Sequence, residues 1–283
     1  MKLIATVCQG SGPVNEDGIG LLGPPGDLQA AWVFDGVTGI NDRAYLPGRT
    51  DAAWLVARAD HHLRLALGAE LAARATLALV VEGVRADQAA ALEGIVLPER
   101  FDPPAACLVL WRRWREGSEL IRIGDSRTLV RFADELQVSP DSPLAPDEHA
   151  AIVEAQALRE TGVTERRDVL ERLTPRLHAM RQRRNRPGGY GVLEADPACL
   201  DFIEVVALDQ PVEVLLCSDG LYRLVDVYHA LRPDELLRRA VAPGGLAALY
   251  SELRAIEAAD PDCRRYPRIK SADDAAAVCL GRA

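Results

Sequence analysis

The stretch VLLCSDGLYRL, residues 214–224, leads from an apolar, strand-like run directly into a serine, an aspartate and a glycine. The same order occurs in AWVFDGVTG, residues 31–39, where Asp35 follows the apolar run as Asp219 does in the first stretch. A single Asp-Gly pair at a strand end usually makes a turn, because Asp accepts local backbone hydrogen bonds and Gly tolerates positive φ. Two such strand ends predict that Asp35 and Asp219 meet at one site.

Acidic residues occur at strand ends in five places, and four of these lie directly against apolar runs. They are NED at 15–17, DG at 35–36, GDSR at 124–127, SDG at 218–220 and DD at 273–274. Two carboxylates about 4 Å apart at an effective dielectric near 20 repel by about 4 kcal/mol, and a domain is stable by only about 5–15 kcal/mol. Divalent cations remove this repulsion, and oxygen ligands without clustered His or Cys suit Mg²⁺ or Mn²⁺ rather than zinc.

The composition limits the classes of partner. The chain has 283 residues, 48% hydrophobic and 27% charged, and we expect a single domain over 1–283. A net charge of −9 argues against a nucleic-acid partner, which would need a basic face. No run of 18 apolar residues is present, so we expect no membrane span. The six cysteines form no CxxC pair, which favours buried thiols in a reducing cytoplasm.

The order of predicted elements indicates an α+β fold. Strands come in runs with helices between the runs, which favours antiparallel sheets with helices packed outside. The predicted strands are 2–8, 17–22, 29–35, 105–112, 118–124, 127–132, 202–207, 212–218 and 275–280; the predicted helical regions are 50–92, 146–182, 226–231, 233–242 and 244–258. A dinucleotide-binding fold is rejected, because CQGSGPVN has Asn15 where the third glycine is needed and Pro13 at the helix entry.

The acidic segments, taken in order, resemble those of the metal-dependent protein phosphatases of the PP2C (PPM) family. The matching pieces are VNEDGIG (14–20), VFDGVTG (33–39), RIGDSRTLV (122–130), LLCSDGLYRLVD (215–226) and SADDAAAVCL (271–280). The resemblance covers nearly the whole chain. It implies a four-layer α-β-β-α sandwich of two antiparallel sheets flanked by helices, with two Mn²⁺ or Mg²⁺ ions in a cleft at one end.

The resemblance also implies a role for each acidic residue. Asp35 would bridge the two ions, and the Gly36 carbonyl and Glu16 would complete the shell of one of them. Asp219 and Asp273 would hold the other ion. A hydroxide held between the ions would attack phosphorus in line, so the catalytic centre would be built on Asp35 and Asp219.

Two further acids and the substrate follow from the same resemblance. Asp17 would orient ligands or waters, and Asp125 would be structural or a weak ligand. The expected substrate is a phosphoserine or phosphothreonine protein, with a small phosphate ester as the alternative.

Three positions depart from the family pattern. Gly12 stands where many relatives have the Arg that grips the substrate phosphate, and Arg43 or Arg49 is the candidate replacement, with a surface role as the alternative. Val37 replaces a His proposed to protonate the leaving group in animal members. Arg223 replaces an Asp that helps to bind a third ion, so we expect two metals rather than three.

Two other classes of hydrolase do not fit the sequence. An aspartyl-nucleophile phosphatase needs a DxDxT-like start, which Asp35 does not begin, and a serine hydrolase needs GxSxG, which Ser218 does not fit. The remaining alternative is a catalytically silent PP2C-like domain that binds a partner.

The basic run RQRRNR at 181–186 is interpreted as a solvated helix end, with a surface for acidic partners as the alternative. The metal hypothesis requires that residues such as Glu16 and Asp219 gather around ions instead of pairing with arginines.

Overall fold

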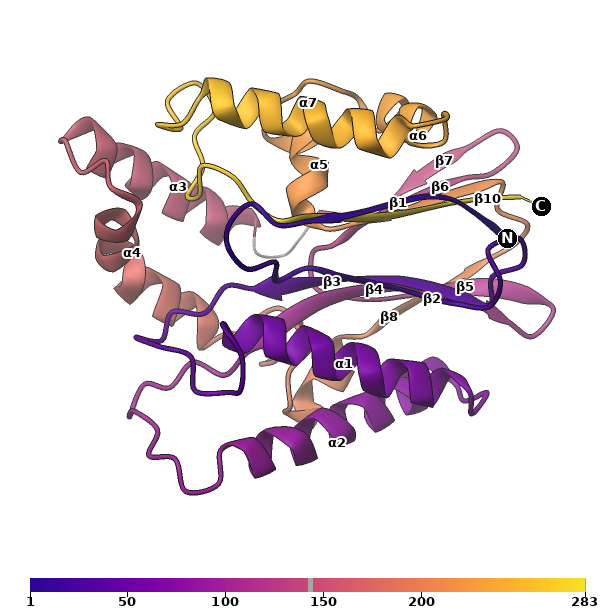
Figure 1. Cartoon of the computed structure of the whole chain (residues 1–283), viewed down its shortest axis with the longest axis horizontal. Helices are drawn as coiled ribbons and strands as arrows, with labels where there is room; N and C mark the ends of the chain where they lie inside the picture. The colour runs from indigo at the N-terminus through magenta and orange to yellow at the C-terminus, as the bar shows by residue number, and fades with distance from the viewer. Residues whose placement is uncertain (142–144, 283) are drawn as a thin grey trace.

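The computed structural model describes residues 1–141 and 145–282. Two five-stranded antiparallel sheets face each other between two layers of helices (Figure 1). The predicted α+β, four-layer architecture is therefore confirmed. The inner faces of both sheets form one apolar layer, to which β3 contributes Ala31 and Val33 and β9 contributes Val214 and Leu216.

The first sheet brings the two ends of the chain together. Its strand order is β1 (Lys2–Gln9), β10 (Ala275–Gly281), β9 (Glu213–Cys217), β6 (Arg127–Arg131) and β7 (Leu136–Val138). Strand β10 lies between β1 and β9, with Gln9 opposite Ala275 and Cys217 opposite Ala277. The loop after β1 and the loop before β10 therefore leave the sheet at the same end.

The second sheet has its most buried strands at its centre. Its order is β2 (Gly18–Leu22), β3 (Ala30–Val37), β4 (Ala105–Trp114), β5 (Gly117–Ile123) and β8 (Glu204–Leu208). Side chains alternate along β3, because successive residues of a strand point to opposite faces. Trp32 and Phe34 pack outward against helices, whereas Ala31 and Val33 face the other sheet. Asp35 continues this inner row, opposite Cys107 of β4.

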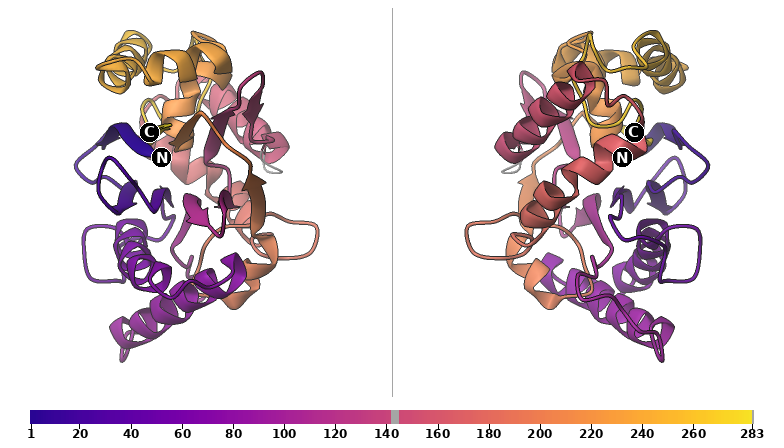
Figure 2. Two further views of the ribbon diagram at one scale, coloured as in Figure 1. Left: turned by 90° about the vertical axis from the view of Figure 1, so that its right-hand side faces the viewer. Right: turned by 90° about the vertical axis from the view of Figure 1, so that its left-hand side faces the viewer.

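Helices cover both outer faces and one end of the sandwich. Helices α1 (Asp51–Leu67) and α2 (Ala73–Ala91) cover the second sheet, and α5 (Asp219–Asp226), α6 (Pro233–Ala240) and α7 (Gly245–Ala259) cover the first. Helices α3 (Ala145–Glu160) and α4 (Arg166–Arg181) lie across one end (Figure 2). A short 3₁₀ helix, Pro197–Phe202, precedes β8. None of the helices described is long and apolar enough to cross a membrane.

Several predicted boundaries were wrong. The helical regions 50–92 and 146–182 are each two helices, because Glu70 and Gly162 adopt the left-handed backbone conformation that ends a helical run (φ 46° and 95°). The short strand β7 and the 3₁₀ helix were not predicted. The predicted helix 226–231 was wrong beyond Asp226, because α5 begins at Asp219 itself and ends at Asp226. Asp219 is thus the first residue of a helix, where a carboxylate is favoured by the helix dipole.

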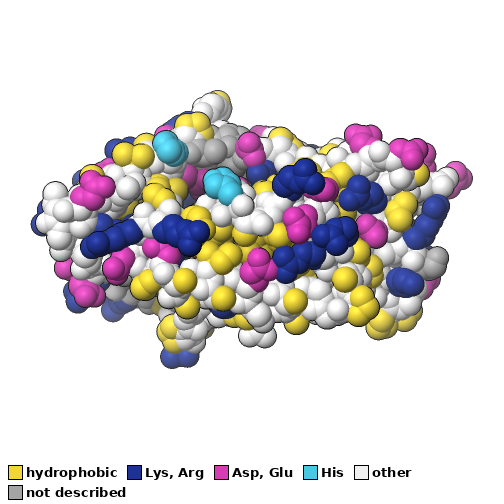
Figure 3. Space-filling model, turned by 90° about the horizontal axis from the view of Figure 1, so that it is seen from above, with side chains coloured by type: hydrophobic (Ala, Val, Ile, Leu, Met, Phe, Trp, Pro, Cys, Tyr) yellow, Lys and Arg dark blue, Asp and Glu magenta, His cyan; other side chains and the backbone are white. Residues whose placement is uncertain are grey.

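The face over α6 and α7 carries charges of both signs (Figure 3). Basic and acidic side chains are interspersed there and form ion pairs such as Arg239–Glu252 and Arg238–Glu235. This face therefore carries local pairs rather than a patch of one sign.

Candidate functional site

The acidic segments that follow β3 and β9 meet at one end of the sandwich, at the left in Figure 1. Asp35 lies on the inner face of β3, and Asp219 begins α5. The backbone N–H of Asp219 donates a hydrogen bond to Asp35 Oδ2 at 3.2 Å. The structure therefore brings together the two Asp-Gly segments, which are 184 residues apart in the sequence.

Asp274 fixes the loop that carries Glu16. Its Oδ1 accepts hydrogen bonds from the backbone N–H and the hydroxyl of Ser11, at 2.7 and 3.0 Å, and its Oδ2 accepts one from the Glu16 N–H at 2.7 Å. The Asp273-Asp274 pair is one of the acidic segments recognised in the sequence, but no role was predicted for Asp274. The pair itself could have indicated a separate role for Asp274, because adjacent residues before a strand point in different directions and contact different partners.

The glycines of the two Asp-Gly pairs allow the acidic segments to touch. A Cβ on Gly36 would lie 2.4 Å from the Glu16 carbonyl oxygen, and a Cβ on Gly220 would lie 1.9 Å from the Asp274 carbonyl oxygen. Each glycine thus packs against the backbone of another acidic segment. The order strand, Asp, Gly in residues 214–224 reflects this close approach, because a larger residue at Gly220 would separate α5 from the start of β10.

Asp17 and Asp35 form the half of the site with the least compensated negative charge. Asp17 is 8% exposed, and its Oδ2 has no hydrogen-bond partner among the described residues. Burial raises the pKa of Asp17 well above its usual value; the Ser218 hydroxyl opposes this rise, and the charges of Asp219 and Asp273 add to it. Burial likewise raises the pKa of Asp35, helped by the nearby carboxylates of Asp219 and Asp17. A cation bound here would relieve both effects.

Asp273 is in a different situation, because two basic side chains bind it. Arg223 Nη2 lies 2.6 Å from Asp273 Oδ2, and Lys270 Nζ lies 2.9 Å from Oδ1. Arg223 also lies 4.0 Å from Asp219, one helical turn before it in α5. Burial alone would raise the pKa of Asp273, but Arg223 and Lys270 lower it below the usual value. The carboxylate expected to bind a metal ion therefore pairs with an arginine and a lysine instead.

Thr38 and Lys270 extend this network to Glu16, and neither residue was predicted as part of the site. The Thr38 hydroxyl donates to Glu16 Oε2 at 2.5 Å and accepts from Lys270 Nζ at 3.0 Å. Lys270 is one of only two lysines in a chain that uses arginine elsewhere, and it stands three residues before Asp273. A lysine so isolated, close to Asp273 in the sequence, could have indicated a specific role at the acidic site.

The chemistry of these residues favours a divalent cation most clearly in one half of the site. The unpartnered Asp17 oxygen and the mutual repulsion of Asp35 and Asp219 favour a cation between β3 and the loop of Glu16. The oxygens of Asp273 are directed to basic side chains. Within residues 1–141 and 145–282, no three His, Cys, Asp or Glu side chains are already arranged as a metal-binding group. Neither half of the site is therefore preformed as a complete metal-ion shell among the described residues.

Solved bacterial phosphatases share this fold over nearly their whole length. The PPM Ser-Thr phosphatase MsPP of Mycobacterium smegmatis, in complex with cacodylate, aligns with a TM-score of 0.55 at 16% identity, covering 100% of both chains. PppA of Pseudomonas aeruginosa, a key regulatory component of T6SS, aligns with a TM-score of 0.55 at 20% identity over 98% of this chain and 96% of its own. The serine/threonine phosphatase Stp1 of Staphylococcus aureus aligns with a TM-score of 0.51 at 15% identity over 100% of this chain and 98% of its own.

The fold is that of the PPM phosphatases. No protein-family model matches the sequence, and no curated protein matches it either. At identities of 20% or less, the PPM likeness concerns the arrangement of strands and helices. The roles of individual side chains at the acidic site rest on their own contacts.

The two arginines predicted to replace the phosphate-binding Arg lie in different surroundings in the PPM-type fold. Arg49 donates from Nη1 to the Pro13 carbonyl at 3.0 Å, so it contacts the loop that contains Gly12. The Arg43 guanidinium stacks on the ring of Tyr45 at 4.8 Å. Of the two, Arg49 is the one placed beside the position that Gly12 leaves without a side chain, and its phosphate-binding role stays a prediction.

A cavity of about 360 Å³ adjoins the Asp219 side of the PPM-type site. Asp125, Glu148, Asp219 and Arg223 line it. Burial raises the pKa of Glu148 to about 8, with Asp125 and Asp219 adding to the shift. Burial raises the pKa of the Cys107 thiol, and the nearby charges of Asp125 and Asp35 raise it further. Asp125 thus belongs to the surroundings of Asp35, and its role as a ligand stays a prediction.

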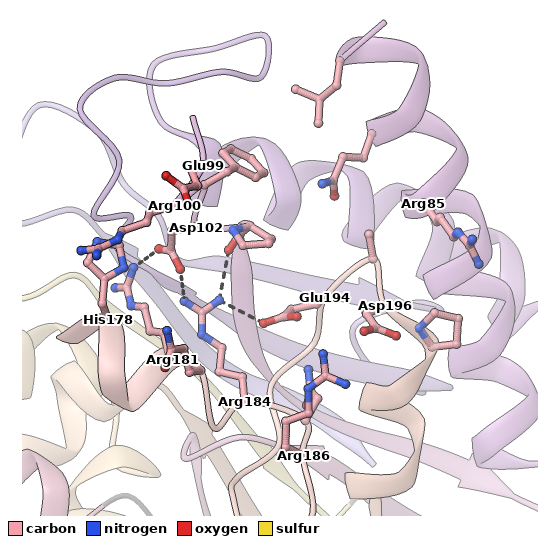
Figure 4. A pocket seen from close by; sticks show the side chains of 18 of the residues that line it. Arg85, Glu99, Arg100, Asp102, His178, Arg181, Arg184, Arg186, Glu194 and Asp196 are labelled. Carbon is pink, nitrogen blue, oxygen red and sulfur yellow. Dashed lines mark hydrogen bonds and ion pairs between the residues drawn. The ribbon is translucent and has the colours of Figure 1, made fainter. Parts of the chain in front are cut away.

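A cavity of about 1060 Å³ lies beside the site and contains a cluster of ion pairs (Figure 4). Arg184 binds Asp102 Oδ1 and Glu194 Oε1, at 2.5 and 3.0 Å, and Arg181 binds the other Asp102 oxygen. Arg181 also donates to the Thr38 carbonyl at 2.6 Å, which connects this cluster to the loop after β3. The interpretation of RQRRNR as a solvated helix end was wrong for Arg181 and Arg184, whose side chains are 13% and 5% exposed.

Proposed function

We propose that the protein is a metal-dependent serine/threonine phosphoprotein phosphatase that hydrolyses phosphate monoesters. The observation that supports this most directly is the meeting of Glu16, Asp35 and Asp219, from three separate segments, at one end of a PPM-type sandwich. The buried, unpartnered oxygen of Asp17 beside them supports a cationic ligand. Mn²⁺ and Mg²⁺ are the candidates, because the ligands are oxygen atoms.

In this proposal Glu16, Asp35 and the Gly36 carbonyl would hold the cation, and Asp17 would orient its remaining ligands. A bound divalent cation lowers the pKa of its water and stabilises negative charge on a phosphoryl group. The chain itself supplies a rigid frame: β3 fixes Asp35, Asp274 fixes the Glu16 loop, and Gly36 lets the two meet. The Thr38 hydroxyl orients the Glu16 carboxylate through its hydrogen bond.

Turnover of p-nitrophenyl phosphate and of a phosphothreonine peptide tests the proposal. We expect hydrolysis with Mn²⁺, none after EDTA, and recovery on adding Mn²⁺ back. Asp35→Asn keeps the shape of the side chain but removes its charge, and should lower kcat/KM by a factor on the order of 10² to 10³ or more. Asp201→Asn changes an exposed carboxylate in the same way and should leave kcat/KM unchanged.

A second function is favoured by a specific observation. Asp273 is bound by Arg223 and Lys270, and Gly12 removes the expected phosphate-binding side chain. Both features suit a catalytically silent PPM-type domain that binds a partner. Absence of turnover of both substrates, in protein that binds Mn²⁺, would favour this second function over the phosphatase.

A further inference from the structure

Asp273 has both carboxylate oxygens engaged by side chains of this chain. Oδ2 is bound by Arg223 and Oδ1 by Lys270, at 2.6 and 2.9 Å. The three side chains are 13–24% exposed, so the ion pairs are largely shielded from water. A cation that needed Asp273 as a ligand would have to displace both basic groups from a poorly hydrated site, which is unfavourable because each would lose its partner.

The position of Arg223 is fixed by the helix that carries Asp219. The two residues are one turn apart in α5, and their charged groups lie 4.0 Å apart. Arg223 therefore lies between Asp219 and Asp273, the two carboxylates that resemblance to the PP2C family assigns to one ion. Lys270 is held on the other side of Asp273 by the Thr38 hydroxyl at 3.0 Å. Together the guanidinium and the ammonium carry the charge of one divalent cation.

In the other half, Asp17 and Asp35 form no ion pair with a basic side chain among the described residues. The Asp17 Oδ2 atom is buried without a partner among the residues described, and Asp35 Oδ2 receives only a long hydrogen bond from the Asp219 N–H. The site therefore divides into a half whose carboxylate binds basic side chains and a half whose uncompensated carboxylates favour an added cation.

We propose that Arg223 and Lys270 take the place of one of the two metal ions, so that the site binds a single divalent cation at Glu16 and Asp35. This inference rests on the proposed function and specifies its cofactor. Asp273 is then an internal partner of Arg223 and Lys270 rather than a metal ligand. Asp219 contributes its backbone N–H to Asp35 and its carboxylate to the field around Arg223.

The number of bound Mn²⁺ ions tests the inference directly. EDTA-stripped protein is titrated with Mn²⁺ by calorimetry, and the bound metal is characterised by electron paramagnetic resonance. Two Mn²⁺ ions about 3.5–4 Å apart would couple magnetically, whereas one ion gives an isolated spectrum. We expect one uncoupled Mn²⁺ per chain in the unmodified protein.

Removing both basic groups should open the second position. The double variant Arg223→Gln/Lys270→Gln is expected to bind two Mn²⁺ ions with a coupled spectrum. The matched control Arg232→Gln/Lys2→Gln removes the same charge from exposed positions and should still bind one. If the Arg223→Gln/Lys270→Gln variant does not fold, the number of Mn²⁺ ions bound by the unmodified protein still tests the inference.

The outcomes separate the two proposals. Two Mn²⁺ ions in the unmodified protein, with turnover, would overturn this inference and leave the phosphatase proposal intact. One ion with turnover supports both. Absence of Mn²⁺ binding and of turnover overturns both, and one ion without turnover supports the inference while favouring a silent domain.

Discussion

Two clusters of buried carboxylates lie side by side in this protein and differ in how their charge is neutralised. Asp102 is 5% exposed at its side chain, and Arg184 and Arg181 each bind one of its oxygens. Asp17 is also buried and Asp35 is half-buried, but here burial and the surrounding carboxylates raise the pKa values of both. Arg181 joins the two clusters through the Thr38 carbonyl, so they share one loop.

The comparison separates structural acids from acids available to a ligand. A buried carboxylate that has its own guanidinium is part of the scaffold, because its charge is satisfied within the chain. A buried carboxylate surrounded by like charges is held in place by the rest of the fold and favours an added cation. Asp273 occupies a metal-ligand position in the sequence pattern, yet its contacts with Arg223 and Lys270 place it with Asp102.

The largest effect on stability should come from neutralising Asp102. Asp102→Asn leaves Arg181 and Arg184 buried with less negative charge, and should lower the free energy of unfolding by about 3–5 kcal/mol. Asp35→Asn, measured in EDTA, should leave it unchanged or raise it, because repulsion among the acids falls. Urea unfolding of both variants checks this contrast.

Asp201→Asn serves as the control, because Asp201 forms an exposed ion pair with Arg74 and such pairs contribute about 0–1 kcal/mol. Equal losses of stability in Asp102→Asn and Asp35→Asn would remove the distinction between the two clusters.

A smaller loss should follow from Gly220→Ala, which tests the packing of the acidic site itself. The added methyl would meet the Asp274 carbonyl oxygen, so α5 or the start of β10 must move. We expect the free energy of unfolding to fall by about 1–3 kcal/mol, together with loss of Mn²⁺ binding. Thermal unfolding and Mn²⁺ titration measure the two effects.

Gly26→Ala is the matched control, because a Cβ at Gly26 has open space around it. A Gly220→Ala variant as stable and as metal-competent as Gly26→Ala would show that the contact between the two segments is not needed.

A pH dependence of stability should arise from Glu148. Its pKa is about 8 in the folded protein and near 4.5 in the unfolded chain, so the folded state binds the proton more tightly. The stabilisation is therefore complete below about pH 4.5 and is lost as the pH rises toward 8. Glu148→Gln should flatten the fall in unfolding free energy across this window, measured by urea unfolding in EDTA.

Glu160→Gln, an exposed position on the same helix, should keep the pH dependence of the unmodified protein. Identical curves for Glu148→Gln and the unmodified protein would place Glu148 outside the influence of the acidic site.

Much of the architecture could be predicted from the chain because its strands are strongly apolar and well separated. The central strands around Trp32, Val109 and Leu215 were predicted within a few residues of their observed bounds. The predictions failed where single residues decide: Glu70 divides the first helical region, and Asp219 begins a helix instead of a turn. Local propensity does not resolve such positions, because tertiary packing selects among conformations of similar energy.

The sequence by itself determined which segments carry carboxylates and that a glycine follows Asp35 and Asp219. It did so because apolar periodicity and turn chemistry are local properties. Only the tertiary structure decided which basic group neutralises which acid. Arg223 and Lys270 reach Asp273 while Arg181 and Arg184 reach Asp102, and these pairings depend on how α4, α5 and the sheets pack together. Coulombic partners are set by distance in space, which the order of residues along the chain does not specify.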